Sequence, residues 1–544
     1  MLENSGKSVV LYSDFGAVGD GVTNDFFAIY NAHEYANLHK LPVKADEGKT
    51  YLITHTKKNG VPLTAAIKTD TDWQGATFII DDSALEDDIE SENTECRGCI
   101  FTILPYEEKL EISKEAIATL KNVGTSTTSM KLGLGYPALL EVYNENHRNY
   151  HRYGYNSSSE QKEIVLIDSN GNLDPEASFL RDYSEVTKIL ATRIDIPPLT
   201  VKNATFIQIA SHINPFFEKS PGVYAKRVGK GFARNIRILR SNTTLDCVNH
   251  KIKGEITLKE QLEGKRGPFY NGFYSISGAH NVTVQNSTVS ARRYYFAGTY
   301  GFSASMSNRI TFKNCSQDNF YIRNEDGSES DRLSMSLVPE FNKPYCWGFG
   351  GTNLCKNMVY DSCRISRFDA HKGLHNGKII NSHLTMVNLI GGGHFLIENT
   401  LIDMRDGGIF NLRRDYGSTW EGTVEIKNCE VRKQDGNQEV VDVCNFAWVN
   451  QDFGYTCHVP NIILDGLTLP ESVKTVNMVK YNTPPGESEI EPSVHLGTLK
   501  NGEENLNPTV PPAYISAKNT DGRPAVLVNV PFFNNTILNG VIKE

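Results

Sequence analysis

The sequence has few of the features that mark several common protein classes. No apolar run approaches the roughly 20 residues of a membrane-spanning helix, and no block rich in Lys and Arg suggests a nucleic-acid surface. The formal net charge is -9, so an anionic polymer could be held only by a locally basic surface. We therefore expect neither a membrane span nor a nucleic-acid partner.

Cysteine is also scarce, with 10 residues in 544, and the spacing does not resemble a small disulfide scaffold. Most of these cysteines are therefore expected to be buried thiols. Cys96 and Cys99 form the one close pair. Because no second pair follows at zinc-site spacing, we predict no metal site and no cofactor.

The first residues, Met1 to Asn4, have neither the charged start nor the apolar stretch of a secretory signal. We expect an extracellular or cell-surface protein whose export signal is missing from this sequence. The alternative is a protein that leaves its cell as part of a virion.

The segment Asp14–Asp25 contains three glycines, and an apolar-periodic stretch follows it through Leu38. This pattern predicts a strand, a glycine turn and then a helix, with Thr23 or Asn24 as the helix cap. A nucleotide-binding interpretation is weak, because the glycines lack the Gly-x-Gly-x-x-Gly spacing and no βαβ pattern follows.

The same segment resembles the N-terminal cap motif of the pectate-lyase-like superfamily, which includes polygalacturonases, rhamnogalacturonases and many phage tailspikes. The resemblance implies an all-β fold, a right-handed single-stranded parallel β-helix with an N-terminal capping helix. It also implies a polysaccharide or oligosaccharide substrate and allows a homo-oligomer, since trimers are common among tailspike relatives.

Further along, short β-rich stretches recur, and each ends in Asn or Asp followed by a small residue. Alternating side chains suit a strand with one face inward, and Asn or Asp suits a corner with left-handed backbone. The intervals between these corners vary from 18 to 47 residues, as expected for coils that carry loops of different length. The predicted corners are Asn286, Asn314, Asp361, Asn381, Asn399, Asn428 and Asp465.

These patterns divide the chain into four parts. We assign residues 1–82 to the N-terminal cap and first coils, 83–200 to an insertion with mixed helix and strand, 201–470 to the β-helix core, and 471–544 to a C-terminal cap or tail. A β-sandwich is the alternative fold, but its strands would need hairpin turns every eight to twelve residues, roughly, and few are present.

Within the insertion we predict a helix over Tyr106–Leu120 and an aromatic-rich segment after it. Rings such as Tyr150 and Tyr153 can stack on sugars, but packing against the solenoid is the favoured interpretation, because aromatic residues more often fill cores.

The densest group of charged and imidazole side chains lies between the predicted corners at residues 361 and 428. Asp369, Asn388 and Asp406 follow their corners by seven or eight residues. Stacked coils place equivalent positions about 4.8 Å apart, so these three residues should form a column. Asp369 and Asp406 would then lie two coils apart, near the upper limit for the two carboxylates of an inverting glycosidase.

The leading hypothesis is therefore a glycoside hydrolase with Asp369 and Asp406 as its acid and base. The alternative for each residue is structural, because an aspartate near a corner commonly forms a turn or a salt bridge. Substrate binding is assigned to a surrounding set of polar residues, in which His371 and Lys372 can also tune the pKa of Asp369 and the arginines can hold an anionic group. This set is Arg293, His371, Lys372, Asn388, Arg405, Arg413 and Asp415.

Two other functions stay open. A polysaccharide lyase would use His371, Lys372 and Arg405, and Ca²⁺ if a cation neutralises the uronate. A non-catalytic glycan-binding protein would use the same surface without cleaving the polymer. The catalytic motifs of polygalacturonases do not occur here in order, since Gly393-His394 lacks the second glycine of Gly-His-Gly, so no residue roles follow from that branch.

Overall fold

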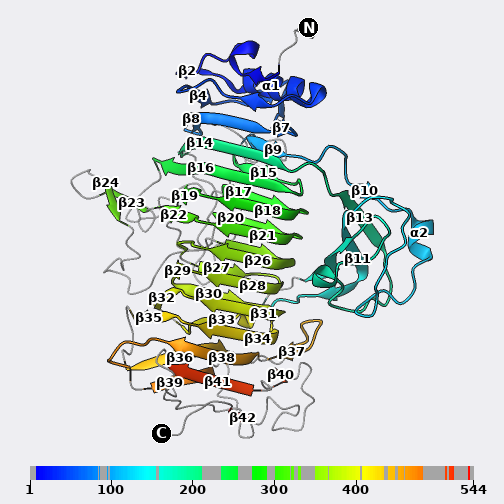
Figure 1. Ribbon diagram of the computed structural model, residues 1–544, viewed down its shortest axis with the longest axis vertical. Helices are drawn as coiled ribbons and strands as arrows, with labels where there is room; N and C mark the ends of the chain where they lie inside the picture. The colour runs from blue at the N-terminus through cyan, green and yellow to red at the C-terminus, as the bar shows by residue number, and fades with distance from the viewer. Residues whose placement is uncertain are drawn as a thin grey trace.

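Short parallel strands wind into a long stack of coils that runs from the N-terminal to the C-terminal end of the molecule (Figure 1). A smaller, separate unit projects from one side of the stack. The computed structural model describes residues 8–83, 85, 95, 98–154, 158–210, 234–254, 272–290, 301–318, 320–323, 329–332, 350–365, 367–404, 407–433, 439–447, 451–458, 460–473, 475–481, 509–510, 514–519 and 537–538.

In the described ranges, one face of the stack is an eleven-stranded sheet in which every neighbouring pair is parallel. Each coil contributes one short strand to it. The strands are β7 (Ala65–Ile67), β9 (Phe101–Ile103), β15 (Ile236–Ile238), β17 (Tyr274–Ser277), β20 (Phe302–Ser305), β25 (Gly350–Asn353), β27 (Arg367–Ala370), β30 (Met386–Leu389), β33 (Phe410–Leu412), β36 (Val440–Phe446) and β39 (Thr475–Tyr481).

The next strand of each coil joins an eighteen-stranded sheet, again counted over the described residues. Its members are β1 (Val10–Leu11), β2 (Asp20–Asn24), β3 (Val43–Lys44), β4 (Thr50–Ile53), β8 (Thr71–Asp81), β14 (Leu199–Ile209), β16 (Thr243–Lys253), β18 (His280–Gln285), β19 (Thr288–Ser290), β21 (Asn308–Lys313), β22 (Ser316–Asp318), β26 (Cys355–Asp361), β28 (Leu374–Ile380), β31 (Gly391–Glu398), β34 (Trp420–Lys427), β38 (Asn461–Leu467), β41 (Tyr514–Asn519) and β42 (Ile537–Leu538).

A three-stranded parallel sheet completes the later coils, with β29 (His383–Leu384), β32 (Leu401–Met404) and β35 (Glu430–Lys433). Among the residues that the structure describes, two-stranded pairings outside these sheets join β5 (Lys57–Lys58) with β6 (Val61–Pro62), β23 (Phe320–Arg323) with β24 (Glu329–Arg332), and β37 (Cys457–His458) with β40 (Thr509–Val510). Because the coils stack in parallel register, the predicted β-helix is confirmed and the β-sandwich alternative is wrong.

The predicted corners carry the expected left-handed backbone. The φ angles of Asn314, Asn381 and Asn428 are 49°, 52° and 49°. The Asn314 amide donates to Asn286 Oδ1 on the previous coil, at 2.8 Å, so successive corners are linked along the stack. At the two corners marked by aspartate, the left-handed residue is the next one, Ser362 or Gly466.

One continuous apolar core fills the inside of the coils from Val10 to Val476. Inward-facing rings stack on the equivalent rings of neighbouring coils, such as Phe78 on Phe206 and Phe312 on Tyr360, each with centroids 4.9 Å apart. This distance matches the spacing of adjacent strands, so the ladder of backbone hydrogen bonds and the ring stacking have the same repeat.

Helix α1 (Phe26–His39) lies at the N-terminal end of the stack (Figure 1). Its buried His33 contacts the rings of Tyr12 and Phe101. The other buried residues, Phe26, Ile29, Ala32 and Ala36, belong to the core of the coils. They recur every three or four positions, so one stripe of the helix covers the exposed end of that core. The N-cap is Asp25, not Thr23 or Asn24 as expected; its carboxylate instead accepts hydrogen bonds from Val18 and Gly19 in the preceding glycine turn.

The side unit is inserted between β9 and β14 and has its own apolar core. It is a four-stranded antiparallel sheet in the order β10 (Leu110–Glu111), β13 (Lys188–Arg193), β11 (Ala138–Asn149), β12 (Ser159–Ile167). Because β9 before this unit and β14 after it belong to the coils, we call residues 104–198 the insertion from here on, in place of the expected range 83–200. The helix predicted over Tyr106–Leu120 is much shorter, since α2 spans only Lys114–Ala118 and Leu110 pairs with β13 instead.

The coils continue past residue 470, where the sequence was expected to form a cap or tail: β39 extends the eleven-stranded sheet and β41 extends the eighteen-stranded sheet.

Short 3-10 turns occur at Ser13–Phe15, Pro175–Ala177 and Arg414–Tyr416. In the described ranges, the longest helix is α1 with 14 residues, and none is long and apolar enough to cross a bilayer. Seven of the eight described cysteines are buried and all eight are free thiols.

Candidate functional site

A line of polar residues runs along the outer face of the eleven-stranded sheet. Strand alternation turns one set of side chains into the core and the other outward, and the parallel register places the outward positions above one another. We call this line the polar column. It consists of Thr102, Arg237, Ser275, Ser303, Gly351, Asp369, Asn388, Asn411, Asn445 and Lys480.

The insertion leaves the eleven-stranded sheet at the C-terminal end of β9, so one edge of the column is flanked by a chain segment that is not part of the regular coil. Long connections on a rigid scaffold are common positions for binding residues.

The predicted column is correct for two of its three members. Asp369 and Asn388 are register partners on β27 and β30. The residue that faces Asn388 on the next coil is Asn411, not Asp406. Asn388 follows its corner by seven residues, but Asn411 follows Asn399 by twelve because the connection between β32 and β33 is longer. Counting from the corner therefore failed on this coil.

Three of the predicted site residues, Arg293, Arg405 and Asp406, lie outside the described residues. The others can be placed. Their roles stay predictions, but their surroundings show what each side chain can do.

Asp369 is fully buried, with an exposed fraction of 0%, and it is held by two arginines. Arg413 donates from one terminal nitrogen to both carboxylate oxygens, at 2.8 and 3.0 Å, and Arg367 donates to Oδ2 at 2.6 Å. The Arg367 guanidinium also contacts the amide oxygen of Asn388, at 3.0 Å. A carboxylate enclosed in this way favours its ionised form and lacks access to water, so it is badly suited to donate or relay a proton.

The ion pairs continue beyond Asp369. Arg413 forms two further hydrogen bonds with Asp415, at 3.1 and 2.8 Å, and Arg152 of the insertion donates to Asp415 Oδ2 at 2.9 Å. Although burial alone would raise it, the pKa of Asp415 is lowered because Arg413 and Arg152 stabilise the carboxylate. We call the five alternating groups Arg367, Asp369, Arg413, Asp415 and Arg152 the ion chain.

His371 lies beside the ion chain, at the C-terminal end of β27, and is partly exposed. Its Nδ1 is 3.2 Å from Asn353 Oδ1, and its ring meets Tyr416 edge-on at 5.6 Å. Burial, with the positive charge of Arg413, lowers the pKa of His371 to about 4. The imidazole is therefore neutral at neutral pH. If Nδ1 carries the proton donated to Asn353, Nε2 is the nitrogen that can accept a proton.

Lys372 follows His371 and is also partly exposed. Burial lowers the pKa of its ammonium, and Lys162 adds to the effect. Arg414 is exposed, whereas the adjacent Arg413 donates to Asp369.

The cluster has an excess of positive charge. The ion chain contains three arginines and two aspartates, and Lys372 adds a further cation. Since the whole chain carries -9, this basic region is local and favours an anionic ligand. The oxygens of Asp369 and Asp415 are bound by guanidinium groups, and within the described ranges no three metal-ligating side chains gather.

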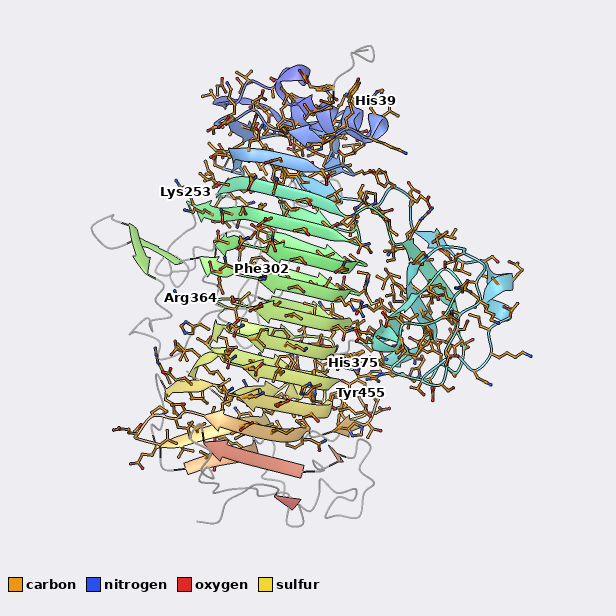
Figure 2. All side chains as sticks on the ribbon, viewed as in Figure 1. His39, Lys253, Phe302, Arg364, His375 and Tyr455 are labelled. Atoms are coloured by element: carbon orange, nitrogen blue, oxygen red, sulfur yellow. The ribbon has the colours of Figure 1, made fainter. Side chains whose placement is uncertain are left out.

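A second pair of titratable residues was not selected from the sequence. His383 Nε2 lies 2.5 Å from Asp403 Oδ2 on the outer face of the three-stranded sheet, and both side chains keep some exposure. The register partner of His383 is Arg364, which Figure 2 labels on the side of the stack away from the insertion. Residues on neighbouring coils form this pair, so only the register of the coils could have revealed it.

The aromatic segment of the insertion packs against the stack, as favoured from the sequence. Tyr150 is buried and contacts the rings of Tyr416 and Tyr455, at 6.4 and 5.2 Å. Tyr153 packs against Phe453 and Cys457. Figure 2 shows Tyr455 on the side of the stack that faces the insertion.

Comparisons with known proteins agree on the fold. No family model and no curated protein matches the sequence. Among solved structures, the chain is similar to tailspike gp61 of Pseudomonas phage phi297, with a TM-score of 0.50 and 10% identity, over 98% of this chain and 84% of that one. It is similar to tailspike gp49 of Pseudomonas phage LKA1, with a TM-score of 0.50 and 12% identity, over 97% and 84%. The chain thus has the right-handed parallel β-helix fold that its N-terminal motif predicted.

Proposed function

We propose that this chain binds a polysaccharide along the polar column and cleaves it beside His371. The observation that carries the proposal is the polar column itself, in which the coils other than those of Gly351 and the buried Asp369 each offer one outward polar side chain. A linear polymer that lies along the stack can repeat its contacts from coil to coil. Hydroxyl and amide side chains are suitable partners for sugar hydroxyls.

The excess of arginine and lysine around the ion chain supports an anionic sugar, such as a uronate, at the position of His371. Because Arg413 is fully occupied by Asp369 and Asp415, it contributes its charge rather than a free hydrogen-bond donor. Lys372 is partly exposed, so we assign it the direct contact with the anionic group.

Hydrolysis is the proposed reaction. In it, neutral His371 accepts a proton from water through Nε2, the resulting hydroxide attacks the anomeric carbon, and an acid protonates the leaving oxygen. Asp406 is the candidate acid from the sequence. We assign Asp369 a positioning role for Arg413 and Arg367, because its buried, doubly paired carboxylate cannot easily exchange protons.

A second reaction, β-elimination, is favoured by the same imidazole. His371 would then remove the proton beside the uronate carboxylate, and the glycosidic oxygen would leave with formation of a double bond. Purely non-catalytic binding is the third possibility, which the fold also permits. For either biological setting we propose a location outside the producing cell, on a virion or a cell surface.

One set of incubations tests these proposals. The protein is incubated with neutral and anionic polysaccharides of plant, algal and bacterial origin, and three quantities are measured: reducing ends, ultraviolet absorbance and polymer length. Hydrolysis raises reducing ends alone, elimination raises both reducing ends and absorbance, and binding without cleavage leaves polymer length unchanged. Failure to bind any polymer would refute the proposal.

A variant pair then tests the assigned base. H371Q should abolish cleavage and keep the fold. H394Q is the matched control, because His394 is exposed on the eighteen-stranded sheet and pairs with Glu425. Equal cleavage by H371Q and the unmodified protein would remove His371 from the mechanism.

A further inference from the structure

One of the contacts between the insertion and the stack is made by the residues that follow strand β11. The Tyr153 amide donates to the carbonyl of Asp415 at 3.0 Å, and the His151 amide donates to the carbonyl of Phe453 at 3.3 Å. Tyr150 is buried between these two backbone contacts and the coils. The segment Tyr150–Tyr153, which we call the docking segment, therefore joins two successive loops of the stack.

Arg152 is the charged side chain of the docking segment. Its Nε donates to Asp415 Oδ2 at 2.9 Å, and its guanidinium lies 5.8 Å from the centre of the Tyr416 ring. Arg413 lies 5.7 Å from the centre of the same ring and binds both oxygens of Asp415. Asp415 is thus held between an arginine of the stack and an arginine that lies more than 200 residues earlier, in the insertion.

We propose that Arg152 is a positioning residue of the site, and that the insertion is therefore a working part of it. The inference rests on the proposed function for its catalytic consequence. Through Asp415, Arg152 fixes the orientation of Arg413, and Arg413 in turn fixes Asp369 beside His371. Removing Arg152 leaves Asp415 held by Arg413 alone, and this loosens the remaining ion chain.

The charges that face His371 give this role a measurable signature. Arg413 and Arg152 lower the pKa of His371, and Asp369 and Asp415 raise it, although burial has the largest effect. A variant without the positive charge at position 152 should therefore have a higher pKa at His371. Since the proton-accepting form is the neutral one, the acidic limb of the activity profile should move to higher pH.

The test compares R152M and R152K with R148M. Arg148 lies near the end of β11, shortly before Arg152 in the chain, is exposed and pairs with Glu160, so R148M removes an arginine from the insertion without touching the ion chain. We expect R152M to lower kcat by about tenfold or more with a smaller change in KM. We also expect its acidic limb to shift upward, R152K to recover the limb but not the full kcat, and R148M to resemble the unmodified protein.

A second measurement does not need a substrate. The titration of His371 is followed by NMR in protein with isotope-labelled histidine, with H371Q identifying the signal. An unchanged His371 titration together with an unchanged kcat in R152M would overturn the inference. If no polysaccharide is cleaved by the unmodified protein, the proposed function fails, whereas the titration still decides whether Arg152 positions the charges around His371. Thermal unfolding of R152M shows whether a loss of activity comes from unfolding. If it does, the kcat and the acidic limb of R152K test the inference instead.

Discussion

Substitution of Asp369 by asparagine separates a structural role from a catalytic one. In the folded protein, this carboxylate is inaccessible and accepts hydrogen bonds from Arg367 and Arg413. Asparagine keeps the shape but removes the charge, so three arginines of the ion chain would be balanced by Asp415 alone. Breaking one partner of a buried ion pair costs about 3–5 kcal/mol, and we expect D369N to lie near the lower value because its amide oxygen still accepts one bond.

The assay is denaturant unfolding of D369N, of the double variant D369N/R413M and of E430Q. Glu430 pairs with Arg432 on the surface, where both side chains are about half exposed, so E430Q should change stability by less than about 1 kcal/mol. The double variant should recover part of the loss, because it removes the cation that D369N leaves unpaired.

Cleavage by the same variants completes the comparison. A D369N protein that is as stable as the unmodified protein, yet inactive, would refute the positioning role. It would support the role as acid or base that the sequence first suggested for Asp369.

Three further expectations concern stability. Burial lowers the pKa of His280 and of His375 to about 4, below the unfolded value of about 6.5, so the unfolded chain binds protons that the folded chain does not. Stability should therefore fall as pH decreases from about 6.5 toward 4, by about 1 kcal/mol per pH unit for each histidine, and H280Q should flatten the slope in denaturant titrations. G422A should lower the free energy of unfolding by at least about 2 kcal/mol more than G75A does. An added Cβ at Gly422 would lie 2.2 Å from a backbone oxygen of the facing coil, whereas no atom lies within 4 Å of an added Cβ at Gly75. Equal shifts in the melting temperatures of the two variants would contradict this. N314A should destabilise more than N314G, because the backbone at Asn314 is left-handed, and equal losses would show that only its corner hydrogen bond matters.

The site was only partly accessible from the sequence. Asp369 and Asn388 could be aligned by counting from their corners, because each follows the left-handed corner residue, Ser362 or Asn381, by seven positions. Nothing in the sequence marks the connection before Asn411 as longer than the others. Counting seven residues from the corner Asn399 therefore selected Asp406. Arg152 could not be found by any periodicity, since an insertion with its own sheet brings it to Asp415.

The residue pattern by itself determined the architecture. Glycine turns, corner asparagines and alternating strands are local features, and a coil that buries one face must stack on another coil. Tertiary structure alone decided which charged residues meet. Ion pairs such as Arg413 with Asp369 join different coils, and their partners depend on register and on loop length, neither of which is written in the local sequence. The same register buried Asp369 and left His371 partly exposed, and this difference in access to water is what changes the assignment of the chemistry.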